Sequence, residues 1–130
     1  MINITTVLII LFIHWVADFL CQTDWQAQNK SKRMDALLAH TGIYSFVWMI
    51  PMMIMFTITS DAIHDSNWFD VKAICFCFIT FVFHTLTDYF TSRLNTKLWN
   101  EKKVHWFFAS IGFDQFLHFV QLLLTYKLLQ

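Results

Sequence analysis

Histidine and aspartate recur at one fixed spacing in the apolar parts of this sequence. Three pairs lie four residues apart: His14 and Asp18, His84 and Asp88, and, in reverse order, Asp114 and His118. On an α-helix, side chains at this spacing share one face and lie about 6 Å apart, so each pair could hold one ion. Imidazole nitrogens and carboxylate oxygens are ligands for zinc, and also for iron or manganese. The spacing therefore predicts helices that present metal ligands.

The elements that must carry these pairs are apolar enough to cross a membrane. Of the 130 residues, 57% are hydrophobic and 14% are charged, which is unlike a soluble domain. Four runs match the length of about 20 residues that a bilayer core requires: 4–21, 36–59, 71–90 and 104–129. Pro51 lies midway in the second run, where a kink is tolerated. The sequence predicts an all-α fold, a single domain over residues 1–130 that forms a four-helix transmembrane bundle.

The connections between the runs differ in charge. Residues 30–33 hold three basic side chains and residues 93–103 hold four, whereas residues 60–70 hold only acidic charges, among them Asp61 and Asp65. By the positive-inside rule, the two basic connections lie in the cytoplasm. We therefore expect a multi-pass protein of the bacterial inner (cytoplasmic) membrane with both termini on the non-cytoplasmic side. The first run follows no basic residue and precedes no small-residue cleavage site, so we expect a retained helix rather than a signal peptide.

Seven polar side chains are expected at one depth in these runs. The pairs in the first and third runs stand in the last turns before a basic connection. His40 lies about one turn into the second run, and Asp114 lies about ten residues into the fourth, near 15 Å from its start. All seven thus fall in the cytoplasmic half of the membrane, where they could meet. They are His14, Asp18, His40, His84, Asp88, Asp114 and His118.

The three aspartates in this set need a source of positive charge. A charged aspartate at the centre of a membrane costs roughly 2.5 to 3.5 kcal/mol, and no lysine or arginine stands at the same depth in the sequence. A divalent metal would supply that charge. Zinc takes four ligands, so seven donors exceed the needs of one ion, and we expect two zinc ions, with iron or manganese as alternatives. A proton relay and a purely structural polar network remain open.

Other polar residues lie next to the expected ligands. Gln22, Tyr44 and Gln115 could orient the ligands, or could only form hydrogen bonds between helices. Lys30 and Arg93 stand at cytoplasmic helix ends, where they either only set topology or also hold an anionic phosphate at the mouth of the site.

Several stretches together resemble an uncharacterised family of small bacterial and phage multi-pass membrane proteins. They are HWVADFLCQTDWQAQNK, LLAHTGIYSF, FHTLTDYFTSRL and FDQFLHFVQLLL. More distantly, histidine and aspartate spaced in this way on several helices are similar to the predicted membrane-bound metal-dependent hydrolases, zinc-dependent phospholipase C and the single-strand-specific zinc nucleases. The phospholipase and the nucleases are soluble enzymes that hold zinc ions inside an all-helical fold and cleave phosphate esters. The resemblance therefore implies phosphoester hydrolysis.

If the cluster is catalytic, two metals about 3.5 to 4 Å apart would bind a phosphate ester and lower the pKa of a water molecule. The catalytic carboxylates would be those of Asp18, Asp88 and Asp114. A site just below the membrane surface suits a membrane lipid with a phosphate group, such as a phospholipid or a prenyl phosphate. It does not suit nucleic acid, because the net charge is zero and the basic connections are short.

Two other classes of function remain open from the sequence. A metal or proton transport module would use the same ligands, but residues 71–83 offer almost no ionisable group for a path to the outer face. A structural or regulatory membrane protein of phage or bacterial origin would use the metal only as a staple. The short chain could also pair with itself as a homo-oligomer to bury its polar faces.

Overall fold

The chain folds into helices of very different length. The computed structural model describes residues 2–59 and 66–130, and for residue 59 and residues 66–70 it describes the backbone only. Across these ranges the fold is all-helical and contains no strand. The elements are α1 (Ile4–Trp15), a π-helical segment η1 (Val16–Leu20), α2 (Asp24–Asn29), α3 (Met34–Val47), α4 (Met49–Thr59), α5 (Ser66–Asn100) and α6 (Val104–Leu129).

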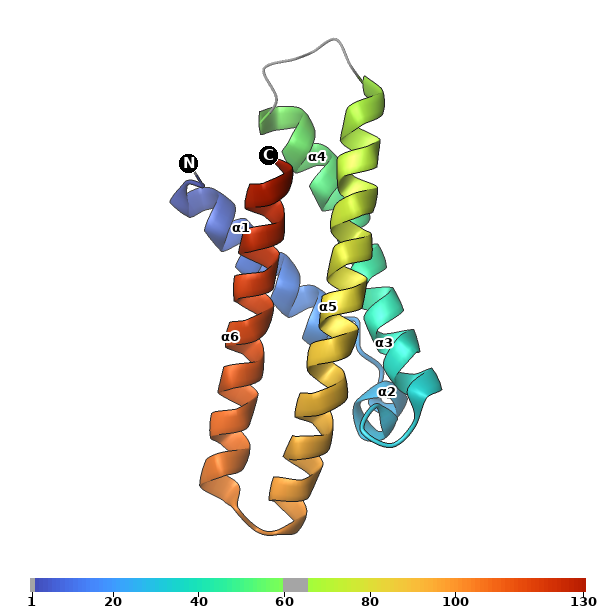
Figure 1. Cartoon of the computed structure of the whole chain (residues 1–130), viewed down its shortest axis with the longest axis vertical. Helices are drawn as coiled ribbons and strands as arrows, with labels where there is room; N and C mark the ends of the chain where they lie inside the picture. Colours follow the sequence, from blue (N-terminus) through green and yellow to red (C-terminus); the bar gives the residue numbers. More distant parts are fainter. Residues whose placement is uncertain (1, 60–65) are drawn as a thin grey trace.

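The two longest helices, α5 and α6, form an antiparallel hairpin (Figure 1). α5 runs to Asn100 rather than to the expected end at residue 90. It ends where Lys102 takes a left-handed conformation with φ 57° and the Lys103 N–H donates to the Leu98 carbonyl at 2.9 Å. This is the hydrogen bond of a helix C-cap motif that reverses the chain tightly. The hydrophobic run therefore marks the apolar part of α5 but not its end.

The second apolar run is broken into α3 and α4 at Trp48. Pro51 lies one turn later and has no N–H to donate to the carbonyl of Val47. The Met52 N–H still donates to the Trp48 carbonyl at 3.0 Å, so the chain re-enters a helix at once. The helix is thus interrupted close to Pro51, where the sequence tolerates a kink, and the two helices together remain one candidate span, Met34–Ile58.

The prediction of four membrane spans is confirmed for only three helices. Met34–Ile58, Val71–Asn100 and Val104–Leu129 are long and apolar enough to cross a membrane, whereas Ile4–Leu20 is shorter. At 1.5 Å per residue, Ile4–Leu20 reaches only about 25 Å, less than a hydrocarbon core of about 30 Å. α1 contacts α6 and crosses the hairpin obliquely (Figure 1). The three long helices indicate a membrane protein.

The first connection contains a helix that the hydrophobic pattern did not predict. α2 begins with a capping box in which the Gln26 N–H donates to Thr23 Oγ1 at 3.3 Å and the Thr23 N–H donates to Gln26 Oε1 at 2.9 Å. α2 lies toward the same end of the molecule as the turn between α5 and α6, so the two basic connections share one end (Figure 1). The acidic connection with Asp61 and Asp65 lies outside the described residues.

The interior has an apolar part and a polar part. Around α4, the apolar part is built by fully buried side chains, among them Trp48, Met52, Phe56, Phe76 and Tyr126. Midway along α5 and α6, the interior is lined by histidine and aspartate instead. Many large apolar side chains, such as Phe46 and Leu128, face outward. An apolar exterior around a polar core is the arrangement that a bilayer favours.

Candidate metal centre

All seven predicted ligands are buried in the polar part of the interior, with exposed fractions between 0% and 9%. They come from five elements, of which α1 and η1 are consecutive and the others lie far apart in the sequence. His14 is in α1, Asp18 in η1, His40 in α3, His84 and Asp88 in α5, and Asp114 and His118 in α6. Within each pair the four-residue spacing keeps both side chains on the interior face of the helix.

Three of the donor atoms form a small triangle. His40 Nε2 lies 3.1 Å from Asp18 Oδ1 and 3.2 Å from His84 Nε2, and His84 Nε2 lies 3.5 Å from Asp18 Oδ1. Ligands at 2.0–2.2 Å around a tetrahedral zinc ion are about 3.3–3.6 Å apart. The triangle therefore has the size of one face of a zinc coordination shell.

The Asp18 carboxylate carries an unsatisfied atom at this triangle. Asp18 Oδ1 is buried and has no hydrogen-bond partner among the described residues. A buried carboxylate oxygen without a partner is costly, so such atoms usually bind an ion or an ordered water molecule. The donor set of Asp18, His40 and His84 therefore fits a divalent cation.

Asp88 lies between this triangle and a second group of donors. Its Oδ2 atom is 3.3 Å from His40 Nε2 and 3.8 Å from His84 Nε2, which makes it a fourth donor to the first group. Its Oδ1 atom is 3.3 Å from His118 Nε2, which in turn is 3.4 Å from Asp114 Oδ1. The carboxylate of Asp88 thus has one oxygen facing each group, as a bridging ligand does.

His14 lies one layer outside these donors. Its Nδ1 atom is 2.7 Å from the Tyr44 hydroxyl and its Nε2 atom is 2.9 Å from Gln115 Oε1. Gln115 Nε2 donates to Asp18 Oδ2 at 3.1 Å and to Asp114 Oδ2 at 3.4 Å. If the tyrosine hydroxyl donates to Nδ1 and Nε2–H donates to the glutamine, one tautomer satisfies the whole chain of bonds.

Tyr44 and Gln115 therefore take the orienting positions expected of them. The Tyr44 ring also stacks on the His84 imidazole, with ring centroids 3.8 Å apart. Thr91 adds a contact that the sequence did not indicate, because its hydroxyl donates to Asp114 Oδ1 at 2.6 Å. These contacts hold both rings and carboxylates in place, as the outer partners of metal ligands do.

Lys30 corrects the charge argument made from the sequence. Its ammonium lies 2.7 Å from Asp88 Oδ2 and 3.4 Å from His40 Nε2, so a basic residue does reach the aspartates. The capping box of α2 turns the connection back toward the bundle, which a linear count of residues cannot show. Burial lowers the pKa of Lys30, but Asp88 and Asp18 raise it more, so the net pKa lies above its ordinary value.

The formal charge of the cluster changes with Lys30 included. Three carboxylates and one ammonium leave −2 if the histidines are neutral. One divalent cation therefore balances the cluster, and a second would leave it positive unless an anion enters with it. On charge alone the cluster needs only one divalent cation, and the expectation of two zinc ions stays a prediction.

Comparison with known proteins places the chain in a family. The family model described as Protein of unknown function (DUF3307) matches residues 6–130, which include the whole polar core. The chain belongs to the DUF3307 family. This confirms the resemblance to an uncharacterised family. No curated protein and no solved structure matches. The similarity of this DUF3307 protein to hydrolases therefore stays a prediction, and so does its phage origin.

Two predicted site residues of the DUF3307 chain lie apart from the cluster. The guanidinium of Arg93 packs over the Tyr89 ring at 3.7 Å from its centroid and donates to the Tyr89 carbonyl at 2.7 Å. Gln22 follows η1 in a half-buried position, and in the described parts of the chain its side chain forms no hydrogen bond. The structure therefore places Lys30, and not Arg93, at the cluster.

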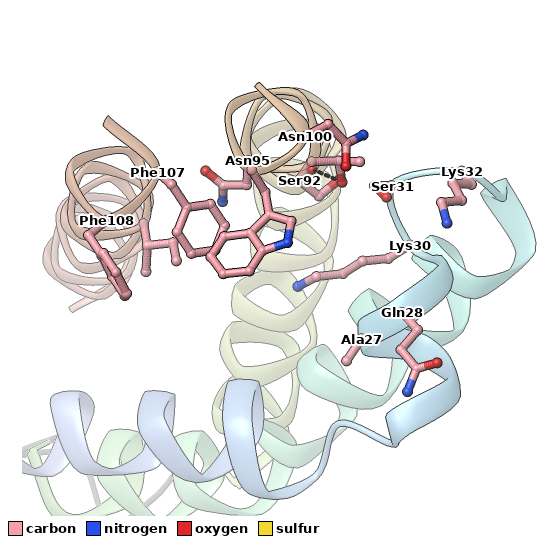
Figure 2. Close-up of a pocket in the computed structure, with 13 residues that line it drawn as sticks. Ala27, Gln28, Lys30, Ser31, Lys32, Ser92, Asn95, Asn100, Phe107 and Phe108 are labelled. Atoms are coloured by element: carbon pink, nitrogen blue, oxygen red, sulfur yellow. Dashed lines mark hydrogen bonds between the residues drawn. The ribbon is translucent and has the colours of Figure 1, made fainter. Parts of the chain in front are cut away.

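A pocket of about 600 Å³ adjoins the cluster of the DUF3307 protein through Lys30 (Figure 2). Its walls come from the end of α2 and the connection after it, the last turns of α5 and the first turns of α6. The apolar run ends at residue 90 and therefore does not predict this pocket, which is formed by the part of α5 beyond it. The signal was present, since Ser92, Asn95 and Trp99 continue the interior face of Asp88 at helical spacing.

Proposed function

We propose that this protein is a membrane-embedded, metal-dependent hydrolase that cleaves a phosphate ester of a membrane lipid. One observation carries the proposal: Asp18 Oδ1, His40 Nε2 and His84 Nε2 converge within 3.5 Å, and the carboxylate oxygen is buried without a hydrogen bond. Zinc is the metal that we propose, with iron or manganese as alternatives, because the donors are imidazole and carboxylate.

The two donor groups give the residues separate roles. Asp18, His40, His84 and Asp88 would hold the first ion, while His84, Asp88 and His118 form the donor group for a second, with Asp114 next to His118. A bound divalent ion supplies Lewis acidity, which polarises a phosphoryl group and makes water more acidic. Thr91 and Gln115 keep the carboxylates oriented through the hydrogen bonds they donate.

Charge favours a phosphate substrate. With Lys30 the cluster has a formal charge of −2, so one divalent ion neutralises it. A second ion adds two positive charges that an anionic phosphate would match. Lys30 sits where its ammonium could leave Asp88 and bind a phosphate oxygen, because it already lines the adjoining pocket.

The site would work from the cytoplasmic side of the bacterial inner membrane. The two basic connections lie at one end of the molecule, the end that the pocket adjoins, and the positive-inside rule assigns such an end to the cytoplasm. The same rule would put both termini on the opposite side, provided that α1 reaches it. A lipid is the substrate that such a location offers, since its phosphate lies at the membrane surface.

A structural metal staple is the second candidate function. The donors join α1 and η1 to α3, α5 and α6, and all of them are nearly inaccessible. A closed site of this kind would stabilise the bundle without chemistry. Transport is less well supported, because Trp48, Met52 and Phe76 fill the interior beyond the cluster with apolar side chains.

Hydrolysis by the purified protein tests the enzyme against the staple. We expect the chain, loaded with zinc in detergent, to release a phosphorus-containing product from mixed phospholipids. Asp88→Asn removes the bridging charge and should lower the rate by at least about 100-fold. Glu101→Gln is the matched control, because Glu101 pairs with Lys103 on the surface at 2.6 Å and should leave the rate unchanged. If the metal-loaded protein hydrolyses none of these lipids, the result would contradict the enzyme and favour the structural metal staple.

A further inference from the structure

The pocket next to the cluster has a polar wall with unused hydrogen-bonding atoms. Ser92 and Asn95 line it, and Ser92 Oγ and Asn95 Oδ1 are buried behind its surface without a hydrogen-bond partner among the described residues. Buried polar atoms are rarely left unpaired, so these two would be satisfied by polar groups of a ligand or by water. Both lie on the face of α5 that carries Asp88 one and two turns earlier.

The opposite wall is aromatic and opens toward the apolar surface. The rings of Trp99 and Phe107 pack with centroids 5.0 Å apart, and Phe108 extends the same wall. Trp99 and Phe108 are 57% and 63% exposed, so this wall continues onto the outer surface of the helices. A molecule that reaches the pocket from the membrane would therefore meet aromatic surface first and polar atoms behind it.

The charges of the lining select among lipids. Lys30 and Lys32 line the pocket, and the side chains that form its walls include no carboxylate. Lys30 points into the space between the walls (Figure 2), and its ammonium contacts Asp88 at the edge of the metal centre. A phosphate diester would be attracted by this arrangement, whereas a head group with its own ammonium would be repelled by the two lysines.

We propose that this pocket is the head-group subsite of the hydrolase and that it takes an anionic phospholipid whose head group is uncharged and hydroxylated. The phosphate lies against Lys30, and the hydroxyl groups of the head group bond to Ser92 and Asn95. The aromatic wall of Trp99 and Phe107 covers the carbon face of the head group. This inference rests on the proposed function, because it is the metal centre beside Lys30 that would act on the phosphate.

Lipid binding to the purified full chain tests the subsite without relying on turnover. Native mass spectrometry in detergent would compare phosphatidylglycerol with phosphatidylcholine and phosphatidylethanolamine of identical acyl chains. Intact lipid and cleaved product differ in mass, so binding and hydrolysis are read separately. We expect phosphatidylglycerol to bind at least about tenfold more tightly than either of the other two lipids. Equal affinities for the three lipids would overturn the proposal.

Variants of the polar wall localise the binding. Asn95→Asp is nearly isosteric and adds a negative charge, so it should weaken phosphatidylglycerol binding by about tenfold or more and leave phosphatidylcholine binding unchanged. Trp99→Ala should also weaken it, whereas Trp106→Ala, an exposed tryptophan outside the pocket, should have no effect. Wild-type affinity for phosphatidylglycerol in Asn95→Asp, with native helix content, would contradict the subsite.

The same measurements separate this inference from the proposed function. If lipid binding is selective and is lost in Asn95→Asp, but the chain hydrolyses no lipid, the subsite is supported and the proposed hydrolase function is contradicted. If the chain hydrolyses lipid but binds all three lipids equally well, the hydrolase function is supported and the head-group subsite is contradicted.

Discussion

The two oxygens of Asp88 face different partners, and one of these partners, Lys30, balances the charge of the carboxylate. Oδ2 is 2.7 Å from the Lys30 ammonium, and Oδ1 is 3.3 Å from His118 Nε2. The Asp88 side chain is 2% exposed and that of Lys30 is 19% exposed, so the ion pair is largely shielded from water. Among the described lysines and arginines, Lys30 is the residue that pairs with a buried carboxylate of the cluster. We therefore expect the stability of the folded protein to depend on both Lys30 and the metal.

Replacing Lys30 with methionine should destabilise the metal-free protein more than the metal-loaded protein. Lys30→Met leaves the buried Asp88 carboxylate without its cation, and breaking a buried ion pair in this way costs about 3–5 kcal/mol at full burial and less at a partly exposed pair. A bound divalent ion would restore part of that loss. Thermal unfolding in detergent, with and without zinc, measures both effects.

Lys32→Met is the control for this prediction, because Lys32 lies two residues away and is exposed. It should unfold like the wild type in both conditions. The same melting temperature for Lys30→Met and Lys32→Met in the metal-free state would show that Lys30 does not stabilise the cluster.

At the scale of elements, α2 determines where Lys30 lies. The capping box of Thr23 and Gln26 begins α2, and its C-terminal end leads directly into Lys30. Hydrophobic periodicity could not predict this helix, since α2 is short, polar and carries no apolar stripe. The S/T-x-x-Q spacing of Thr23 and Gln26 was the signal available in the sequence.

Thr23→Ala should lower the free energy of unfolding by about 1 kcal/mol, because it removes the hydroxyl that accepts from the Gln26 N–H. Thr23→Ser keeps a hydroxyl and should retain most of the stability. Denaturant unfolding of both variants in detergent gives the difference. If both variants lose the same stability, the cap does not hold α2.

The long helices were more accessible to prediction than the short ones. The apolar runs predicted the membrane-spanning parts of α3 with α4, α5 and α6, because an apolar exterior must appear in the sequence. The runs could not show that α1 crosses the others obliquely or that α5 continues to Asn100. Tilt depends on packing against neighbours, and the polar end of α5 carries no hydropathy signal.

For the molecule as a whole, the convergence of the polar residues could be predicted better than their individual roles. The four-residue spacing and the shared depth predicted that histidines and aspartates meet. Two groups of donors that could hold a metal ion do form, one from Asp18, His40 and His84 and one from His84, Asp88 and His118. The outer position of His14 could not be predicted, because its spacing to Asp18 equals that of His84 to Asp88. His14 differs from His84 because Tyr44 and Gln115 lie next to its two ring nitrogens in the fold.

The molecule also separates its two kinds of interior along the helices. Apolar side chains such as Trp48 and Phe56 fill the part around α4, and the polar cluster opens through Lys30 to the pocket between α5 and α6. The pocket therefore lies on one side of the cluster, and the apolar core lies on the other. A metal centre that receives a ligand from one end of the molecule would be placed in this way.

The metal content of the purified protein tests this account most directly. Elemental analysis of the chain, expressed with sufficient metal and purified in detergent, should find about one or two equivalents of zinc, iron or manganese. Asp18→Asn, which is nearly isosteric, and His84→Ala should lose that metal, whereas His105→Ala, an exposed histidine outside the cluster, should keep it. A folded wild-type chain without bound metal, or an Asp18→Asn variant with unchanged metal content, would contradict the metal centre.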